Sequence, residues 1–139
     1  MTVFREKVFV ETSGTRDMTD ITHDVNDIVA ASGIKQGICH IFHVGSTGAI
    51  GTIEFESGLA ADFTEAMSHM FPAGRHYMHE QRWHDGNGHS HLQSTFLGAE
   101  ITVPVADGAL ICGVWQQIFH YEADIKPRRR EIIITVIGE

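Results

Sequence analysis

The sequence predicts an α+β fold in which largely antiparallel, sandwich-like β-sheets are accompanied by two or three α-helices. Segments with alternating or continuous apolar character outnumber the segments with helical spacing. The strand-like segments are also grouped along the chain more than they alternate with helices, as is typical of α+β proteins. The length of 139 residues allows one hydrophobic core. A single domain covering residues 1–139 is therefore expected.

The N-terminal half is predicted to contain three strands and two helices. Apolar residues recur at helical spacing from Ile21 to Val29, and Gly33 is placed to end that helix in the left-handed conformation. Pro72 follows the second helix and cannot continue it. The predicted elements are a strand over residues 2–12, a helix from Thr19 or Asp20 to Gly33, a strand over 37–44, an alternating strand over 49–56 and a helix over 58–70.

The C-terminal half is predicted to begin with a polar loop over residues 77–91 and to continue mainly as β-structure. Residues 90–97 fit either a short helix between Asn87 and Gly98 or a strand, and the helix is favoured. The remaining strands are expected over 100–105, 109–121 and 130–138. Asp107-Gly108 between two β-rich runs indicates a hairpin.

Charge and hydropathy exclude several classes of function. The formal charge of −8 argues against nucleic-acid binding, which requires a basic face to neutralise phosphates. No apolar run is long enough to span a membrane, and the first residues do not resemble a signal peptide. A cytoplasmic protein is expected, in which Cys39 and Cys112 are buried and reduced.

The most unusual segment is the run from Tyr77 to His91, which holds four histidines, two carboxylates and one Asn among fifteen residues. Imidazole is a common metal ligand near neutral pH, so the segment indicates either a metal or catalytic site or a polar loop with hydrogen-bonded histidines. His89 and His91 would share one face of a strand. On a helix they diverge by about 200°, and only one of them could join a given site.

Two further segments offer polar groups from strands or turns. Glu54 is in phase with Thr52 on a strand, so it is either on a solvated face or a carboxylate aimed at the histidines. Ser46 and Thr47 lie in a Gly-Ser-Thr-Gly turn that could receive a phosphate through its backbone amides or could be purely conformational.

The only dense basic cluster is Lys126 to Arg130. Alternation along a strand would place Arg128 and Arg130 on one face and Arg129 on the other. Two guanidinium groups on one face suit bidentate capture of phosphate. The alternative is ion pairing with nearby carboxylates, namely Glu122, Asp124 and Glu131.

Several runs taken together resemble the YjbQ family, also called UPF0047, of secondary thiamine-phosphate synthases. The similarity extends over nearly the whole chain from Lys7 onward. Its most specific feature is that the motifs Asn-x-x-x-His, Gly-x-Trp-Gln and Arg-x-Arg occur in this order. The matching runs are Gly45-Ser-Thr, Ile53-Glu54, Asp62, Tyr77-x-His79, Asp85-Gly-Asn87-Gly-His-Ser-His91-Leu92, Leu97-Gly98, Val103-Pro104-Val105, Gly108, Gly113-Val-Trp115-Gln116, Asp124, Arg128-Arg-Arg130 and Val136-Ile-Gly138.

The resemblance implies a homotrimer and a pocket for a phosphorylated small molecule. Carried over to this sequence, the family pocket holds Glu54, His79, Asn87, His91, Trp115, Gln116, Arg128 and Arg130. Together with the residues considered above, this predicts catalytic roles for His91, Glu54, Asn87 and Gln116, and substrate contacts from Ser46, Thr47, Trp115, Arg128 and Arg130. A divalent metal, zinc or magnesium, is expected on His79, His91 and His89. Many members carry a histidine where this chain has Gly45, and His43 would point the same way on a strand.

The implied reaction joins hydroxymethylpyrimidine diphosphate to thiazole phosphate and releases pyrophosphate, either as the main activity or as a side activity. Displacing pyrophosphate requires stabilisation of charge on the leaving group, which arginines or a divalent cation supply. Two alternatives use the same histidines, carboxylate and arginines. One is a metal-dependent hydrolase, and the other is a non-enzymatic trimer that binds a metal or ligand.

Overall fold

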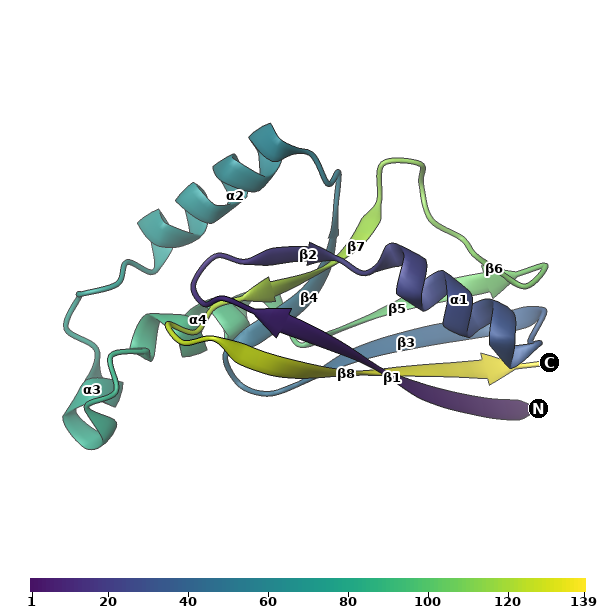
Figure 1. Ribbon diagram of the computed structural model, residues 1–139, viewed down its shortest axis with the longest axis horizontal. Helices are drawn as coiled ribbons and strands as arrows, with labels where there is room; N and C mark the ends of the chain where they lie inside the picture. The colour runs from purple at the N-terminus through teal and green to yellow at the C-terminus, as the bar shows by residue number, and fades with distance from the viewer.

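The computed structural model describes residues 1–139 as two antiparallel sheets and four helices in one domain (Figure 1). The predicted α+β class is confirmed. Both termini lie at one end of the molecule, and the helices α2, α3 and α4 gather at the other. The elements are β1 (Thr2–Thr12), β2 (Met18–Asp20), α1 (Thr22–Ser32), β3 (Gln36–Val44), β4 (Gly48–Ile53), α2 (Ser57–Met70), α3 (Met78–Trp83), α4 (Gly88–Leu97), β5 (Glu100–Ala106), β6 (Ala109–Leu110), β7 (Gln117–Glu122) and β8 (Arg128–Gly138).

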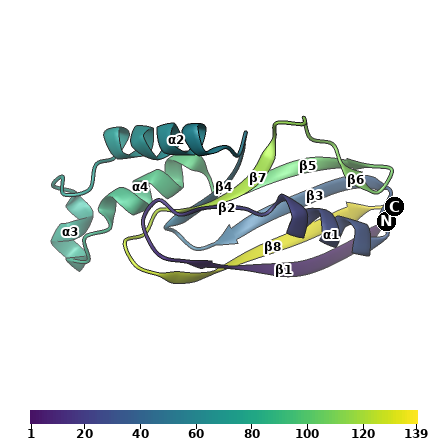
Figure 2. The same ribbon diagram turned by 45° about the horizontal axis from the view of Figure 1, so that its top comes forward.

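The larger sheet has the order β1-β8-β3-β5-β6, and the long strands β1 and β8 pair from Thr2 opposite Gly138 to Thr12 opposite Arg128. One face of this sheet carries the main core. Helix α1 and the strands of the second sheet cover it, as Figure 2 shows for α1. Val25 and Val29 supply the apolar face of α1, and Gly33 ends that helix with a left-handed φ of 70°, as predicted.

The smaller sheet has the order β2-β7-β4 and carries a second apolar cluster under α2. Phe63 from α2 packs edge-on against the rings of Phe119 and Tyr121 on β7. Strand β4 begins at Gly48 beside Glu122 and ends at Ile53 beside Gln117. The two ends of this strand therefore lead to different parts of the surface.

Four sequence predictions need correction. The helix expected from Thr19 or Asp20 begins at Thr22, because Met18–Asp20 form β2 and pair with β7. The alternating strand over 49–56 ends at Ile53, because the Glu56 side chain accepts hydrogen bonds from the Gly58 and Leu59 amides and caps α2. The single strand over 109–121 is instead the short β6, a loop over 111–116 and β7. The loop over 77–91 contains a helix, α3, and the first residues of α4, so the helices number four.

The preference for a helix over residues 90–97 is confirmed by α4, which begins after Asn87 and ends before Gly98. No helix of the structure has both the length and the apolar character required to cross a membrane.

Candidate functional site

The histidine-rich segment is shaped by a tight turn between α3 and α4. His84 adopts a left-handed φ of 54° and ends α3, and Gly86 follows with a φ of 72°. The Glu80 carboxylate accepts hydrogen bonds from the Gly86 amide at 2.6 Å and from the Gly88 amide at 2.7 Å. Glu80 therefore holds the turn closed, and Asp85 and Asn87 are brought beside His79.

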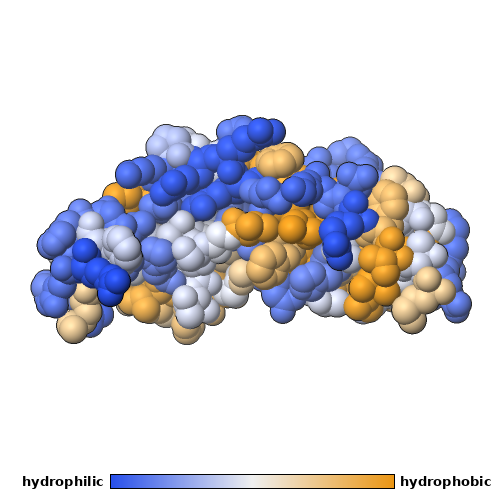
Figure 3. Space-filling view, turned by 90° about the horizontal axis from the view of Figure 1, so that it is seen from below, coloured by the Kyte–Doolittle hydropathy of each residue, from blue (hydrophilic) through white to orange (hydrophobic).

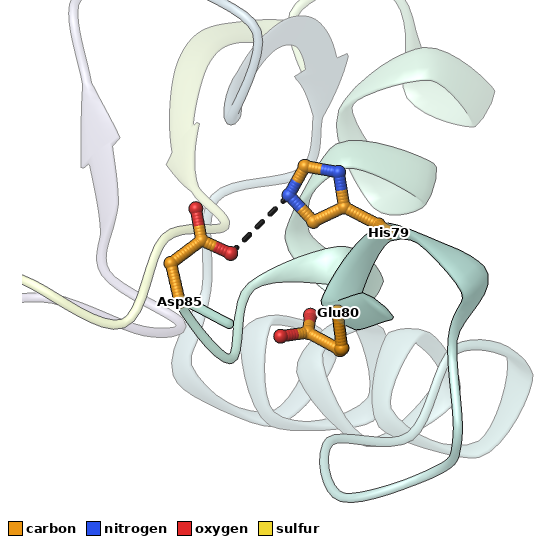
Figure 4. Close-up of side chains that lie close together, drawn as sticks. All are labelled: His79, Glu80 and Asp85. Atoms are coloured by element: carbon orange, nitrogen blue, oxygen red, sulfur yellow. Dashed lines mark ion pairs between the residues drawn. The ribbon is translucent and has the colours of Figure 1, made fainter. Parts of the chain in front are cut away.

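Three side chains meet at this turn at short range. His79 Nε2 lies 3.3 Å from Asp85 Oδ1, and Figure 4 shows the ring directed at that carboxylate. The Asn87 amide places one of its two polar atoms 3.1 Å from His79 Nε2 and 2.9 Å from Asp85 Oδ1. The side chains of His79 and Asp85 are 28% and 39% exposed, so a small ion can reach them from solvent.

The orientation of the Asn87 amide decides what this arrangement can hold. With its nitrogen toward Asp85, the amide donates to the carboxylate and to His79, and no further partner is needed. With its oxygen there, the nitrogen donates to Asp124 Oδ1 at 3.4 Å. His79 Nε2 then faces the Asp85 and Asn87 oxygens. It either donates its ring proton to them or, as the other tautomer, joins them as a third lone pair directed at a cation.

The spacing of the three atoms fits a divalent metal ion. Ligands about 2.0–2.1 Å from such an ion lie roughly 2.8–3.4 Å from one another in octahedral or tetrahedral geometry. The separations of 2.9, 3.1 and 3.3 Å match that range. Glu80 also has an oxygen within 4.8 Å of the His79 and Asp85 atoms, but its oxygens are occupied by backbone amides. Imidazole with two oxygen ligands suits zinc or manganese better than magnesium.

A pocket of about 330 Å³ opens beside these residues. The His91 ring lies in it with its centroid 4.5 Å from that of His79, so the two histidines are brought together as predicted. Arg75 adds a cation at the rim, where its guanidinium lies 5.4 Å from the centre of the Tyr77 ring. The other lining residues are His76, Met78, Gly88 and Leu92.

His89 does not join this group. The α-helix directs it away from His91, and it is only 3% exposed, with its ring 6.5 Å from that of Tyr77. Burial lowers the pKa of His89, and the nearby Glu80 and Asp124 carboxylates oppose the shift. Of the pair in α4, His91 is the one in the pocket, and the metal role expected for His89 has no support from its position.

The arginines form ion pairs inside the chain. Alternation places Arg130 inward, where it donates to both Glu122 oxygens and to Thr47, whereas Arg129 faces outward to Glu11. Arg128 pairs with Asp124 at 2.8 Å and keeps 43% of its side chain exposed. The ion-pair alternative is therefore what the structure shows, and Arg130 has no free bidentate face for a phosphate.

Asp124 links the arginines to the histidine site. Burial alone would raise the pKa of Asp124, but hydrogen bonds from the Ile125 amide, Arg128 and Thr47 bring it below its ordinary value. Thr47 is buried and accepts from Arg130, whereas Ser46 is exposed. Of the two hydroxyls in the Gly-Ser-Thr-Gly turn, only that of Ser46 is open to a ligand.

Glu54, Trp115 and Gln116 lie away from the histidines. Ile53 and Gln117 are paired at one end of β4 and β7, and Gly48 and Glu122, next to the Asp124 network, are paired at the other. Five strand steps of about 3.3 Å separate these ends by roughly 17 Å. In one chain these three residues therefore do not reach the His79 site.

His43 is buried in the core and does not replace the family histidine in the pocket. Its ring centroid lies 5.0 Å from that of His120, both side chains are fully buried, and all four ring nitrogens lack hydrogen-bond partners. Burial, reinforced by the Arg130 charge, lowers the pKa of His43 to about 4. Burial is likewise the main cause that lowers the pKa of His120 to about 3.

Two residues of the site were missed by sequence reasoning. Asp85 stands two positions before Asn87, and the clustering of a carboxylate with Asn and His was a usable signal. Arg75 carries no such signal, because only the turn after α2 brings it to the pocket.

Comparison with known proteins places the chain in a family. The sequence model described as "UPF0047 protein YjbQ-like" matches residues 6–139. The chain belongs to this family. A UPF0047 protein of Methanothermobacter thermautotrophicus is 37% identical over 139 residues, which cover all of this chain and 95% of the relative. The family resemblance seen in the motifs is thereby confirmed.

Two solved structures have the same fold as this chain. A YbjQ-like protein of unknown function from Sulfolobus solfataricus is 39% identical, with a TM-score of 0.93 and 99% of each chain covered. A hypothetical protein from Aeropyrum pernix is 28% identical, with a TM-score of 0.89 over 97% of this chain and 98% of the other. The arrangement of both sheets and of the helices is therefore shared across these proteins.

Proposed function

We propose that the protein is a metal-dependent enzyme acting on phosphorylated small molecules. The reaction that the family resemblance favours is a thiamine-phosphate synthase-like transfer. In it, the thiazole nitrogen attacks the methylene carbon of hydroxymethylpyrimidine diphosphate, the carbon–oxygen bond breaks, and pyrophosphate leaves. The single observation that carries the proposal is the convergence of His79 Nε2, Asp85 Oδ1 and the Asn87 amide within 3.3 Å of one another.

The residues that would hold the metal are His79, Asp85 and Asn87, with His91 beside them. When bound, a divalent ion supplies positive charge that stabilises a leaving pyrophosphate. Arg75 adds a second positive group at the pocket rim, and a guanidinium binds phosphate oxygens with directed hydrogen bonds. Because the thiazole nitrogen carries no proton to lose, no dedicated base is required.

A metal-dependent hydrolase is the second candidate, and the position of His91 favours it. The half-buried His91 ring is next to the proposed metal ligand His79 and can accept a proton from an attacking water. Loss of hydrolysis in His91→Gln with retained metal binding would support this second function. Transfer to a thiazole acceptor with His91→Gln still active would support the first.

We also propose that the protein assembles as a homotrimer, as the resemblance implies. The outer face of the five-stranded sheet exposes large apolar side chains, and Figure 3 shows apolar surface bordered by hydrophilic surface on the face seen from below. Exposed apolar area of this kind is typical of protein–protein contacts. The side chains on the sheet are Val3, Phe9, Ile38, Phe42 and Val44.

The test is titration of the metal-free protein with Zn²⁺ and Mn²⁺ by calorimetry, followed by an assay for thiamine phosphate from the two phosphorylated precursors. We expect one site per chain, and at least about a tenfold weaker affinity in His79→Ala and Asp85→Asn, equivalent to 1.4 kcal/mol. His69→Ala is the matched control, because His69 is an exposed histidine on α2 paired only with Glu65. Unchanged affinity in both site variants would rule out the metal centre.

A further inference from the structure

We infer that the pocket at His79 and His91 is completed by the 111–116 loop of a second copy of this chain. The catalytic importance of this contact rests on the proposed function. The contact itself is inferred only from the surface of the single chain. This surface carries an exposed apolar loop and, away from it, an open apolar pocket that such a loop fits.

The 111–116 loop has no packing partner of its own for its largest side chains. Val114 is 77% exposed, Trp115 is 67% exposed, and Ile111 is 57% exposed. Isolated exposed apolar residues are ordinary, but three within five positions on one projecting loop mark an interaction surface. The loop projects between β6 and β7 in both ribbon views (Figures 1 and 2).

The pocket beside His79 has the chemistry to receive an indole ring. Met78 and Leu92 form its apolar sides, and the His79 and His91 rings and the Arg75 guanidinium offer stacking and cation–π contacts. Its volume of about 330 Å³ lies within the range of sites that enclose a small organic group. Trp115 cannot fill it within one chain, because the loop and α4 lie well apart in both ribbon views.

Charge complementarity supports a second copy as the occupant. Residues 54–65 begin beside the loop, where the Phe55 amide donates to the Gln117 side chain, and they contain four carboxylates and no base. Residues 75–84, which form the pocket rim and α3, contain two arginines and three histidines against one carboxylate. When the loop of one copy meets the pocket of another, the acidic segment faces the basic one, which favours this pairing.

The contact joins two different surfaces and is therefore heterologous. Repeated around an axis, such a contact closes into a ring, as a trimer requires. In this arrangement Trp115 forms a wall of the neighbouring pocket, and the Gln116 amide and the Glu54 carboxylate bring polar groups that one chain alone does not offer there. These residues act by shaping the pocket, and His79, Asp85 and Asn87 remain the metal ligands.

The experiment follows the exposure of Trp115 directly. The chain has two tryptophans, so Trp83→Phe leaves Trp115 as the only one. We expect acrylamide to quench its fluorescence several-fold less in the assembled protein than after Leu92→Arg, which places charge and bulk in the pocket. Met78→Arg, at a side chain that is 77% exposed, repeats the test at a position whose substitution the fold tolerates.

Met70→Arg is the matched control, since Met70 is an exposed apolar side chain on α2 that lines neither the pocket nor the outer sheet face. The inference is overturned if Trp115 is equally accessible with and without Leu92→Arg and Met78→Arg, or if only Met70→Arg exposes it. Neither metal nor substrate enters this assay. A chain that protects Trp115 but binds no metal would therefore overturn the proposed function alone, and a metal-binding chain with exposed Trp115 would overturn this inference alone.

Discussion

Two pairs of neighbouring histidines occupy opposite environments in this protein. His79 and His91 lie at a pocket with ring centroids 4.5 Å apart, and His79 faces an acidic and an amide side chain. His43 and His120 lie 5.0 Å apart in the core, and no ring nitrogen of either has a partner. Ligand-binding capacity therefore depends on the neighbouring acceptors and on access from solvent, and the proximity of two imidazoles is not sufficient.

The buried histidines His43 and His120 also reduce the stability of the fold, whereas His79 and His91 at the pocket do not. An unpartnered buried polar group costs about 1–3 kcal/mol. The rings pack against the backbone of Gly48, where an added Cβ would lie 2.7 Å from His43 Nε2 and 3.0 Å from His120 Nε2. The rings of His79 and His91 have polar neighbours and contact solvent. Their substitution should therefore affect ligand binding far more than folding stability.

The largest expected effect is that the buried histidines His43 and His120 make the free energy of unfolding sensitive to acid. Both pKa values are lowered in the folded protein, to about 4 for His43 and about 3 for His120, from the ordinary value of 6.5. Below pH 6.5 the unfolded chain therefore binds protons that the folded chain does not. The free energy of unfolding should fall with decreasing pH, by about 1.4 kcal/mol per pH unit for each histidine, down to about pH 4.

Urea denaturation between pH 7 and pH 4.5 measures this slope. The double variant His43→Leu with His120→Leu should show a smaller decrease over the same range. An identical slope in the variant and the wild type would mean that other groups cause the acid sensitivity.

The next largest effect concerns the ion pair beside His43. Arg130→Met leaves the fully buried Glu122 carboxylate without its partner and should lower the free energy of unfolding by about 3–5 kcal/mol. Arg129→Met is the control, because its pair with Glu11 is exposed and should contribute about 1 kcal/mol or less. Equal losses in thermal or urea denaturation of the two variants would contradict this assignment.

Metal binding should stabilise the folded protein only through the histidines at the pocket, His79 and His91, and not through the buried pair. Zn²⁺ at about 100 times its dissociation constant should raise the free energy of unfolding by about 2.7 kcal/mol in the wild type. His79→Ala, with its affinity at least tenfold weaker, should keep about 1.4 kcal/mol of this gain or less. The His43→Leu and His120→Leu double variant should keep all of it. A thermal shift with Zn²⁺ that is undiminished in His79→Ala would place the metal elsewhere.

The smallest expected effect concerns the glycine that the buried rings require. Gly48→Ala should lower the free energy of unfolding by about 1–3 kcal/mol, because the new methyl group overlaps both imidazoles. Gly58→Ala at the start of α2 is the control, since its methyl group would meet only the flexible Glu56 carboxylate at 3.2 Å. No loss is expected there, and denaturation of both variants in parallel checks the difference.

The sequence alone determined the elements whose signals are local. Apolar spacing predicted α1 and α2, Gly33 marked the end of α1, and alternation correctly placed Arg128 and Arg130 opposite Arg129. These predictions succeed because side-chain periodicity and left-handed glycine conformations are properties of neighbouring residues. The motifs likewise indicated the family that the comparison confirmed.

The boundaries of some elements and the pairing of side chains distant in sequence were decided only by the tertiary structure. Helix α3 was not foreseen, because its six residues carry no apolar face and it is held by the Glu80 carboxylate bonding to the turn that follows it. The ion pairing of Arg130 with Glu122 was one of two open alternatives, and only the registers of β7 and β8 in different sheets brought the two residues together.

The candidate site divides in the same way. His79, His91 and Asn87 are close in sequence, so their clustering was predictable, and the helical geometry of α4 then separated His91 from His89. Asp85 joins them only through the left-handed turn at His84. Glu54 and Gln116 are carried roughly 17 Å away along β4 and β7. Sequence determines which chemical groups are present, and the paths of the strands decide which of them can meet within one chain.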